Sequence, residues 1–516
     1  MDPVRRLDEI WRHAGLGSHR CLACDVCCRF ASPVASFVPF FTADEMAALG
    51  ERASPHFLAP GASPGDRPLT QPDGEMWRCP FRRPDSQECT VYGQRPLDCR
   101  LYPFVLMFDE PGKQVWLGLD EACPFAFDNP SSPALHQAAD EAARLLEGPL
   151  ADVIAAAPGI VSRYHDHVRP LRALPEATRR VCRSDLGLSR LVSTSYPLLR
   201  DLFESRPTCL TGHAFPAIYL WTDLFNLHWR VEADCLLVFA ESDGVSFLIA
   251  PPLGKGDLAR ALRAAREVMA AINGSRGGAR VQEVDDELLP AFAAEGWQVV
   301  HQAREYLCET ASLVELRGRH FDGRRHDIHR FEKRHTATWR PYEPADFLGC
   351  VALLRRWQRE RAATHPDPFY RCQLEATAFL HLRTLREAEE LGLRGYVVEV
   401  ETGGMEGGMD KWMNDRTVLS DTHPSIQCSI HPTLHSSASP IAAYTFGFPL
   451  MDGVTFADFI EVADLGYPGV AAWTFNRFCR EARDYPFLNL GTDSELPALA
   501  RAKLACRPTR ILNAPL

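Results

Sequence analysis

Apolar and polar residues alternate along the second half of the chain in patterns typical of strands and helices. The apolar runs Cys235–Glu241 and Val245–Ala250 are separated by Ser242-Asp243-Gly244, which predicts a β-hairpin. The turn Gly254-Lys255-Gly256-Asp257 then opens a segment rich in Ala, Leu and Arg, which predicts a helix ending near Asn273-Gly274. From this pattern we expect a mixed arrangement in which strands and helices follow one another.

Helical spacing returns farther along the chain, where we expect helices over 345–363, 373–391 and 470–483. The apolar face of the first is marked by Phe347, Val351, Leu354 and Trp357. Four further apolar segments predict strands: Gly395–Val400, Ile441–Pro449, Val454–Val462 and Phe487–Leu490. Helices that precede a run of strands predict an α+β fold class with α/β-like stretches.

Residues 402–439 interrupt this order, because they show no sustained period and are rich in Gly, Met, His, Ser and Thr. They stand where a short turn would otherwise join two strands, and a loop of this length is unusual in a compact domain. The composition favours a surface insertion. The alternative is a lid or an extra metal-binding loop, in view of four potential ligands: His423, Cys428, His431 and His435.

Overall composition sets limits on the function. The 516 residues suggest two to four domains, and the net charge of −11 argues against a general nucleic-acid coat protein. The first residues carry no secretory signal, and no run of about 18 apolar residues predicts a transmembrane segment. We therefore expect a cytoplasmic protein, in which clustered cysteines are more often ligands or catalysts than disulfides.

The 17 cysteines are unevenly distributed, and eight of them lie near the start of the chain. These eight are the candidate metal ligands: Cys21, Cys24, Cys27, Cys28, Cys79, Cys89, Cys99 and Cys123. Thiolates bind zinc and iron strongly, and C-x-x-C spacing lets two sulfurs reach one metal from a tight turn. Because a zinc ion or an iron–sulfur cluster takes four protein ligands, eight thiols suffice for one site with spares or for two sites.

This segment resembles the YkgJ-type cysteine-cluster family, which is described as zinc- or iron-chelating. The resemblance rests on the Cys27-Cys28 pair and on a second group: Cys79-Pro80-Phe81, Cys89-Thr90-Val91-Tyr92, Arg95-Pro96 and Cys99-Arg100-Leu101-Tyr102-Pro103. It implies metal binding and leaves the metal open. A metal that only holds a small domain together, redox catalysis by the thiols, and disulfides formed on oxidation are the alternatives.

The rest of the chain resembles the phosphatidylglycerol lysyltransferase C-terminal domain family. The matching stretches are Tyr196-Pro197-Leu198-Leu199, 248–254, Glu305-Tyr306-Leu307, the Arg-rich 316–331, 459–464, Asn489, Asp493, Leu499, Lys503 and Leu504. Members carry two tandem GNAT-like folds, and the best-known ones transfer an aminoacyl group from tRNA to a lipid. The two resemblances, with the helical pattern between them, predict four parts: a cysteine-cluster metal-binding domain at 1–130, a helical linker at 131–189, a first GNAT-like domain at 190–310, and a second at 311–516 that contains the insertion.

The Arg-rich segment has chemistry of its own, with eight Lys or Arg and three Asp or Glu in residues 317–340. Guanidinium groups fit phosphate oxygens, so Arg324, Arg325 and Arg330 are candidates to contact a phosphate or a tRNA acceptor end. The alternative is an ordinary solvated helix face. His326 stands where the family usually has Asn.

Carboxylates at the end of a predicted strand are the candidate catalytic groups. Glu461 and Asp464 are suited to hold a substrate amine or to act as general base, with Asp493 and Lys503 completing the pocket. Gly466-Tyr467-Pro468-Gly469-Val470-Ala471 opens the next helix where GNAT enzymes bind acetyl-CoA, although a plain turn into a helix gives the same pattern.

Together these features predict a metal-binding protein, with zinc or an iron–sulfur cluster, that carries a GNAT-like acyl or aminoacyl transferase module. The expected donor is aminoacyl-tRNA or acyl-CoA, which an acceptor amine or hydroxyl attacks directly. A non-catalytic metal sensor and an iron–sulfur redox protein are the alternative functions.

Overall fold

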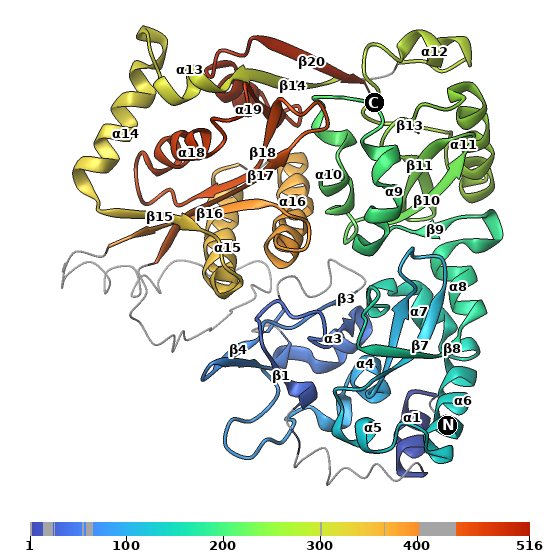
Figure 1. The fold of residues 1–516 in the computed structure, drawn as a ribbon. Helices are drawn as coiled ribbons and strands as arrows, with labels where there is room; N and C mark the ends of the chain where they lie inside the picture. Colours follow the sequence, from blue (N-terminus) through green and yellow to red (C-terminus); the bar gives the residue numbers. More distant parts are fainter. Residues whose placement is uncertain are drawn as a thin grey trace.

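The computed structural model describes residues 3–13, 24, 26–53, 56–57, 65–299, 302–365, 367–401 and 440–515. The 402–439 insertion and Cys21 lie outside these residues. The described chain forms an N-terminal module and two larger sheets with their helices (Figure 1). The predicted α+β fold class is confirmed. No helix in the described part of the chain is long and apolar enough to cross a membrane.

The N-terminal module combines small sheets with short helices. Its sheets are β1-β5-β4 (Arg29–Phe30, Met76–Arg78, Gln71–Asp73), β2-β3 (Phe41–Thr42, Gly65–Asp66) and β6-β7-β8 (Phe104–Phe108, Val115–Asp120, Val168–Ala173). Its helices are α1 (Pro3–His13), α3 (Ala43–Leu49), α4 (Leu97–Leu101), α5 (Pro124–Asp128), α6 (Pro133–Glu147), α7 (Ala151–Ala156) and α8 (Pro175–Cys182). One apolar core joins α1, α4, the β6–β7 hairpin, α6, α7 and α8, so residues beyond 131 pack directly onto the residues before them.

The first large sheet has the strand order β12-β11-β10-β9, with β13 paired to β11 (Figure 1). The strands are β9 (Ser189–Arg190), β10 (Asn226–Glu232), β11 (Cys235–Ser242), β12 (Val245–Leu248) and β13 (Leu253–Gly254). Asp243 and Gly244 both have positive φ, as a two-residue hairpin turn requires, and this confirms the predicted hairpin. The helices are α9 (Tyr196–Phe203), α10 (Phe215–Tyr219), α11 (Leu258–Asn273) and α12 (Leu289–Ala294).

The second sheet has the order β15-β16-β17-β18-β19-β14-β20. Its strands are β14 (Gln302–Glu309), β15 (Ala337–Pro341), β16 (Arg394–Val400), β17 (Ile441–Pro449), β18 (Thr455–Ala463), β19 (Phe487–Thr492) and β20 (Arg510–Pro515). Its helices are α13 (Thr310–Glu315), α14 (Asp322–Arg334), α15 (Phe347–Thr364), α16 (Pro368–Glu387), α18 (Val470–Glu481) and α19 (Pro497–Leu504). The strands and helices predicted for this region are present. The domain limits remain a prediction, and β14, which precedes the limit at 310, is hydrogen-bonded into this second sheet.

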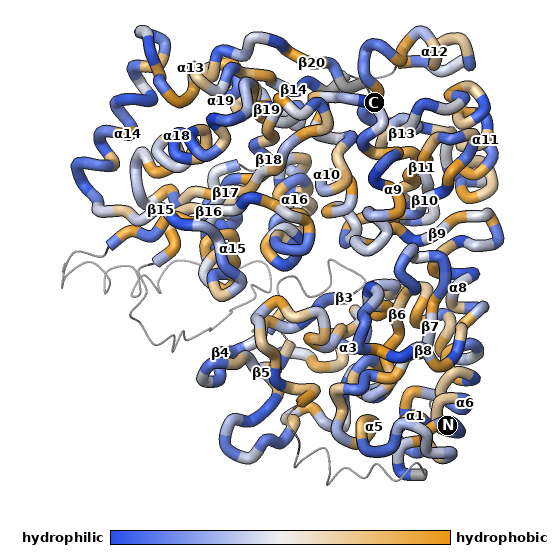
Figure 2. The backbone as a smooth tube through the Cα atoms, in the orientation of Figure 1, coloured by the Kyte–Doolittle hydropathy of each residue, from blue (hydrophilic) through white to orange (hydrophobic). Residues whose placement is uncertain are grey.

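Helices cover both faces of the second sheet. On one face, α15 and α16 pack against Tyr444, Ile460 and Val462. On the other, residues of α14 and α18 pack against Val398 and Ala463. Apolar segments concentrate on the inner strands, whereas α14 is hydrophilic along most of its length (Figure 2). The sheet is therefore the middle layer of three.

Candidate functional site

A β-bulge in β18 places two carboxylates on one face of the second sheet. Glu461 pairs with Thr445 and Ile460 with Phe446, but the next partner of β17, Gly447, lies opposite Asp458. The extra residue shifts the alternation of side chains, so positions three apart come to the same side. Asp458 and Glu461 both interact electrostatically with Arg324 of α14 and with Cys479 of α18. Both carboxylates therefore lie between the sheet and the α14–α18 layer.

Two basic side chains complete this cluster, which we call the β18 carboxylate site (Asp458, Glu461, Arg324 and Lys503). Arg324 donates from Nη2 to Cys506 Sγ at 2.8 Å, and its guanidinium carbon lies 5.0 Å from the centre of the Phe475 ring. Lys503 of α19 donates to the carbonyl oxygens of Leu490, at 2.5 Å, and Thr492 at the end of β19. Each basic group is thus fixed by the chain itself while facing the acidic pair.

Burial dominates the ionisation of the β18 carboxylate site. It raises the pKa of Asp458 to about 6, although Lys503 and Arg324 act in the opposite direction. It also raises the pKa of Glu461, and the charge of Asp458 adds to this effect. Burial lowers the pKa of Lys503 to about 8, against the acidic groups around it. Groups that titrate near neutral pH are suited to general acid–base catalysis.

Several polar atoms at this site are buried without a hydrogen-bond partner among the described residues. They are Asp458 Oδ1, Glu461 Oε2 and Oγ1 of Thr445, which is the partner of Glu461 on β17. Native proteins rarely leave buried polar atoms unpaired, and a bound molecule is one way to satisfy them. The site therefore has acceptors and a hydroxyl ready for a ligand.

The pairing of β18 with β19 is short, and it ends just before the acidic pair. The two strands run parallel and are paired only from Thr455↔Phe487 to Ala457↔Asn489. Beyond Ala457 no ladder joins them, although both strands are fully described. Asp458 is the first residue past this point, so the acidic pair occupies the stretch of β18 that has lost its neighbour on that side.

A second carboxylate pair, the buried Glu305 and the half-buried Glu283, lies where the first sheet's helices meet β14. Glu305 Oε2 accepts from the Thr211 amide at 3.0 Å and from Asn489 Nδ2. Burial raises the pKa of Glu283 to about 8, and the neighbouring Glu305 adds to the rise. Since Glu305 also interacts with Lys503, this pair borders the β18 carboxylate site.

Four of the residues proposed from sequence lie outside the cluster and have structural partners. Asp464 accepts from Arg356 Nη2 at 2.5 Å and from the Gly466 amide at 2.8 Å. Asp493 accepts from the Tyr306 hydroxyl at 2.6 Å. Arg325 donates to Gly318 O at 3.0 Å, and Arg330 pairs with Asp327 at 2.9 Å. Glu461, Arg324 and Lys503 are the three that the structure brings together, and Asp493 is near enough to influence Lys503.

The turn into α18 lies close to the backbone of α14 at Gly469. Gly469 has a φ of +100°, and a Cβ there would lie 2.2 Å from the carbonyl oxygen of Asp327 in α14. A side chain at position 469 would therefore collide with α14, although Gly466 and Pro468 of the same loop are exposed.

The cysteines form a looser group in the N-terminal module. The Cys79 amide donates to the Cys28 carbonyl at 2.9 Å, and Sγ of Cys27 lies 3.9 Å from Sγ of Cys28. Burial raises the pKa of the Cys79, Cys89 and Cys99 thiols, and the nearby Cys28 raises each of them further. Four thiols, those of Cys28, Cys79, Cys89 and Cys99, are therefore close enough to influence one another.

These thiols are not gathered within ligating distance. In the part of the chain that the structure describes, no three His, Cys, Asp or Glu side chains lie close enough together to hold a metal ion. Cys24 is half-buried and Cys27 exposed, whereas Cys123 is buried in the larger core at the start of α5. The donor set still fits zinc or iron chemically, because a nearby cation would stabilise the thiolates that burial now disfavours.

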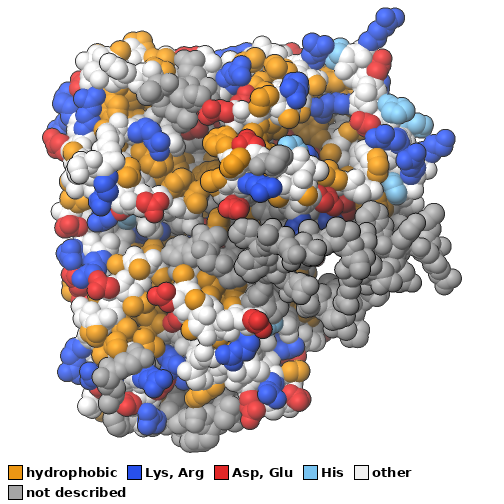
Figure 3. Space-filling model, turned by 180° about the vertical axis from the view of Figure 1, so that it is seen from behind, with side chains coloured by type: hydrophobic (Ala, Val, Ile, Leu, Met, Phe, Trp, Pro, Cys, Tyr) orange, Lys and Arg blue, Asp and Glu red, His pale blue; other side chains and the backbone are white. Residues whose placement is uncertain are grey.

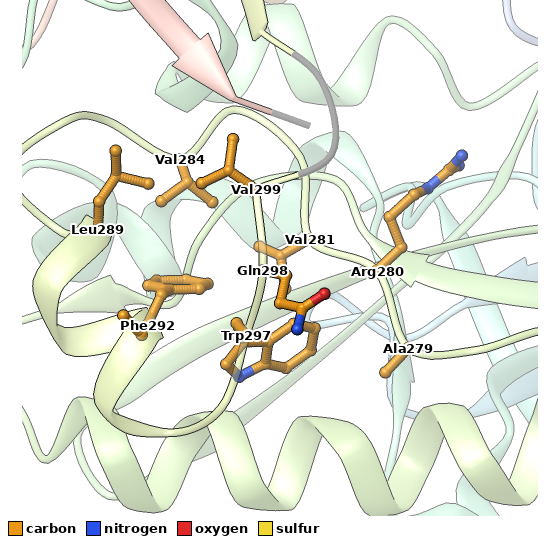
Figure 4. A pocket seen from close by; sticks show the side chains of 10 residues that line it. Ala279, Arg280, Val281, Val284, Leu289, Phe292, Trp297, Gln298 and Val299 are labelled. Atoms are coloured by element: carbon orange, nitrogen blue, oxygen red, sulfur yellow. The ribbon is translucent and has the colours of Figure 1, made fainter.

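A small apolar pocket of about 100 Å³ lies beside α12 (Figure 4). Val281, Val284, Leu289, Phe292 and Trp297 line it. Arg280 is the one charged residue in its lining. The pocket therefore lacks the paired groups that acid–base chemistry needs.

Comparison with known families identifies both parts of the chain. The family model described as "Phosphatidylglycerol lysyltransferase, C-terminal" matches residues 210–497. The model described as "Putative zinc- or iron-chelating domain", with the motif CxxCxxCC, matches residues 20–124. Both resemblances expected from the sequence are thereby confirmed. No curated protein matches the chain.

Several solved structures align with about two thirds of the chain. A conserved protein of unknown function from Bacteroides thetaiotaomicron is 18% identical over 64% of this chain and 99% of that chain, with a TM-score of 0.49. L-PGS from Bacillus licheniformis is 12% identical over 62% and 90%, with a TM-score of 0.39. A tandem GNAT protein from the clavulanic acid biosynthesis pathway is 11% identical over 64% and 97%, with a TM-score of 0.34. None of these similarities bears on the substrate of this chain.

Proposed function

The chain belongs to the phosphatidylglycerol lysyltransferase C-terminal family, and we propose that its C-terminal module transfers an acyl or aminoacyl group to an amine or hydroxyl acceptor. The donor is an aminoacyl-tRNA or an acyl-CoA, and since both are cytoplasmic molecules the proposal places the protein in the cytoplasm. The observation that carries the proposal is the half-buried pair Asp458 and Glu461, each of which has one buried oxygen without a described partner and is influenced by the charge of Arg324.

In the proposed reaction, the acceptor nitrogen or oxygen attacks the carbonyl carbon of the donor ester or thioester. The new C–N or C–O bond forms as the bond to the tRNA ribose oxygen or the CoA sulfur breaks. Glu461 takes the proton of the acceptor, helped by Asp458, and then returns this proton to the leaving ribose oxygen or CoA sulfur. Arg324 and Lys503 stabilise the negative charge that develops on the carbonyl oxygen.

The outer face of α14 supports an aminoacyl-tRNA donor over an acyl-CoA donor. Lys, Arg and His side chains gather at the edge of the molecule where α14 lies (Figure 3). The exposed basic residues of this segment are Arg317, Arg319, Arg325, Lys333 and Arg334. Such a row can follow a phosphate backbone, and in this proposal Arg325 and Arg330 contribute to that surface rather than to catalysis.

The test compares Glu461→Gln with Glu309→Gln, an exposed carboxylate at the end of β14 in the same sheet. Transfer from a panel of aminoacyl-tRNAs and acyl-CoAs is measured with radiolabelled acyl groups. We expect Glu461→Gln to lower the rate by about 10²–10⁴-fold, while Glu309→Gln keeps it. If the unaltered protein transfers nothing from any donor, the transferase proposal is wrong, and a non-catalytic metal-binding function takes its place.

We also propose that the N-terminal module binds zinc or an iron–sulfur cluster through Cys28, Cys79, Cys89 and Cys99. Cys21, Cys24, Cys27 and Cys123 are the remaining candidate ligands. When bound, the metal would hold the surrounding loops together, as in other small cysteine-rich domains. If the thiols come together only when the metal binds, this would explain why the described residues show no preformed set of ligands.

Elemental analysis of anaerobically purified protein tests this proposal, together with its visible absorption. A colourless protein with zinc excludes the cluster, and a brown protein with iron and sulfide excludes zinc. Cys79→Ser should reduce the metal content, whereas Cys372→Ser, an exposed cysteine of α16, should leave it unchanged. Equal metal content in both variants would contradict the assignment of Cys79.

A further inference from the structure

The cysteine-bearing part of the N-terminal module packs against two helices of the second sheet. Val34 and Leu69 contribute to the apolar core that α15 and α16 form with Phe347 and Leu380. β3, which ends at Asp66, lies on the side of the module that faces these helices (Figure 1). The two parts of the chain that separate family models match are therefore in direct contact here.

Hydrogen bonds add to this packing. Arg355 of α15 donates from Nη2 to the Phe57 carbonyl oxygen at 2.9 Å. Arg386 of α16 donates to Asp66 Oδ1 at 3.2 Å and to the Arg67 carbonyl oxygen at 3.4 Å. The side chains of the Arg386–Asp66 pair are only 19% and 15% exposed, so the loss of either partner would be costly. We call this contact the module interface, which consists of α15, α16 and the residues Val34, Phe57, Asp66, Arg67 and Leu69.

These five residues all lie in the stretch of chain between Cys28 and Cys79, two of the candidate metal ligands. The ends of the stretch meet, because the Cys79 amide donates to the Cys28 carbonyl at 2.9 Å and β1 pairs with β5. A metal bound by both thiols would close the stretch at its base, and closing a long loop reduces the freedom that folding must overcome. One contact beside α16, between Arg163 and Glu390 at 3.0 Å, comes from later in the module.

The stretch has little else to hold its shape. Its strands β1 to β5 are two or three residues long, and its apolar core is separate from the larger core around α6. Cys79 belongs to this small core, as do Phe41, Phe57 and Phe81, whose rings contact one another. Small cores usually need a metal or a cross-link. Phe57 therefore connects the surroundings of a candidate ligand to Arg355 of α15.

The helix that receives this contact also touches the strand with the acidic pair. Arg356, the neighbour of Arg355 on α15, pairs with Asp464 at 2.5 Å, just after β18 ends. Residues of α15 pack against Val462, which is next to Glu461 in β18. α15 thus lies between the module interface and the strand that carries the β18 carboxylate site.

We propose that metal binding by the cysteines controls the module interface. With the metal bound to Cys28 and Cys79, the residues of the module interface stay docked on α15 and α16; without it, they detach and leave these helices less stable. The inference rests on the metal site proposed for these cysteines and adds a docking role to it. It holds for zinc and for an iron–sulfur cluster alike, and it does not require the transfer reaction.

Hydrogen–deuterium exchange of the full-length protein tests the proposal in three states: as purified anaerobically, after removal of the metal with a chelator, and after return of the same metal. We expect the amides of residues 380–387 in α16 to exchange about tenfold faster without metal, because this part of the helix loses the packing of Val34 and Leu69. Return of the metal should restore slow exchange.

The outcomes separate the docking role from the metal site itself. Faster exchange in the N-terminal module alone, with α16 unchanged, would overturn the docking role while the metal site stands. A protein that elemental analysis finds free of metal would overturn both.

Arg386→Gln tests the module interface without altering a cysteine. We expect the metal content to stay the same, while residues 65–78, on the other side of the interface, exchange about tenfold faster in the metal-loaded protein. A purely local effect on α16 would leave 65–78 unchanged, and that result would refute the assignment of Arg386. Arg359→Gln, at an exposed position of α15, is the matched control and should alter neither readout.

Discussion

The two large sheets differ in how their inner strands hold acidic residues. In β11 of the first sheet, the buried Glu241 has both carboxylate oxygens bonded by Arg183. In β18 of the second, Asp458 and Glu461 each keep an oxygen with no described partner. Burial of a charge without a partner costs stability, and proteins accept that cost where a group must react or bind. The first sheet is thus a scaffold, whereas the second contains the groups available for chemistry.

The helices that cover the two sheets differ in the same way. Asp257 caps the start of α11, with its side chain accepting from the Arg260 amide at 3.0 Å, and the buried side of α11 is mostly Ala, Leu, Val, Met and Ile. In contrast, α18 begins at Gly469 without a side-chain cap and buries Thr474 and Asn476. The layer over the second sheet thus buries more polar side chains, and the Asn476 amide donates to the carbonyl oxygens of Leu313 and Val314.

The largest effect should come from the apolar scaffold. Phe239 in β11 is fully buried, so Phe239→Ala removes a ring from a packed core and leaves a cavity. We expect the free energy of unfolding, measured by urea titration, to fall by about 3–5 kcal/mol. Val231→Ala, at an exposed position of β10, serves as the control and should change it little. A loss below 1 kcal/mol for Phe239→Ala would remove the basis for calling the first sheet the scaffold.

A smaller effect, and one that depends on pH, should appear in β18. Because burial raises the pKa of Asp458 to about 6, the folded protein holds this proton more tightly than the unfolded chain does. The stabilisation is complete below about pH 4 and is lost as the pH rises through about 6, a change on the order of 2–3 kcal/mol. The side chain at position 458 of the Asp458→Asn variant is neutral at every pH. The part of the decline in the free energy of unfolding that Asp458 causes should therefore disappear.

Urea titrations at a series of pH values measure this difference. Asp484→Asn, an exposed site after α18, is the matched control and should keep the decline. Should Asp458→Asn be less stable than the unaltered protein at pH 8, the carboxylate would be contributing to the fold, and the contrast between the two sheets would fail.

The smallest expected effect concerns the helix cap of the first sheet. Asp257→Ala removes the hydrogen bond to the Arg260 amide, which should cost about 1 kcal/mol. Lys255→Ala, in the same turn and exposed, changes a side chain without a capping role. Thermal unfolding should therefore show a lower midpoint temperature for Asp257→Ala than for Lys255→Ala. Equal midpoints would mean that the hydrogen bond of Asp257 does not stabilise the helix.

Much of the fold of residues 190–516 could be predicted from the sequence, because its strands and helices have clear apolar periods. Ile441–Pro449 was predicted with the bounds that the structure shows, and the hairpin turn at Asp243-Gly244 follows from residues that tolerate positive φ. The partners of β14 could not be predicted in this way. Glu305-Tyr306-Leu307 belongs to the resemblance, but it gives no sign that β19 and β20 flank it.

The candidate site was only partly predictable. Glu461, Arg324 and Lys503 were identified from the resemblance, whereas Asp458 was missed. On a regular strand, residues 458 and 461 point to opposite faces, and the bulge opposite Phe446 and Gly447 leaves no mark in the sequence. The signal that was available is an acidic residue within an otherwise apolar strand. The clustering of the cysteines is visible in the sequence. The distances between their sulfurs depend on the conformation of the loops, which the residue spacing does not determine.

The position of β14 between β19 and β20 has a consequence for synthesis on the ribosome. Tyr306 of β14 bonds Asp493, 187 positions later, so the strand emerges long before its neighbours exist. At translation rates of about 5–20 residues per second, the delay is roughly 10–40 seconds. During that time β14 has two open edges with no strand to pair with, which leaves its backbone hydrogen-bonding groups exposed to other chains.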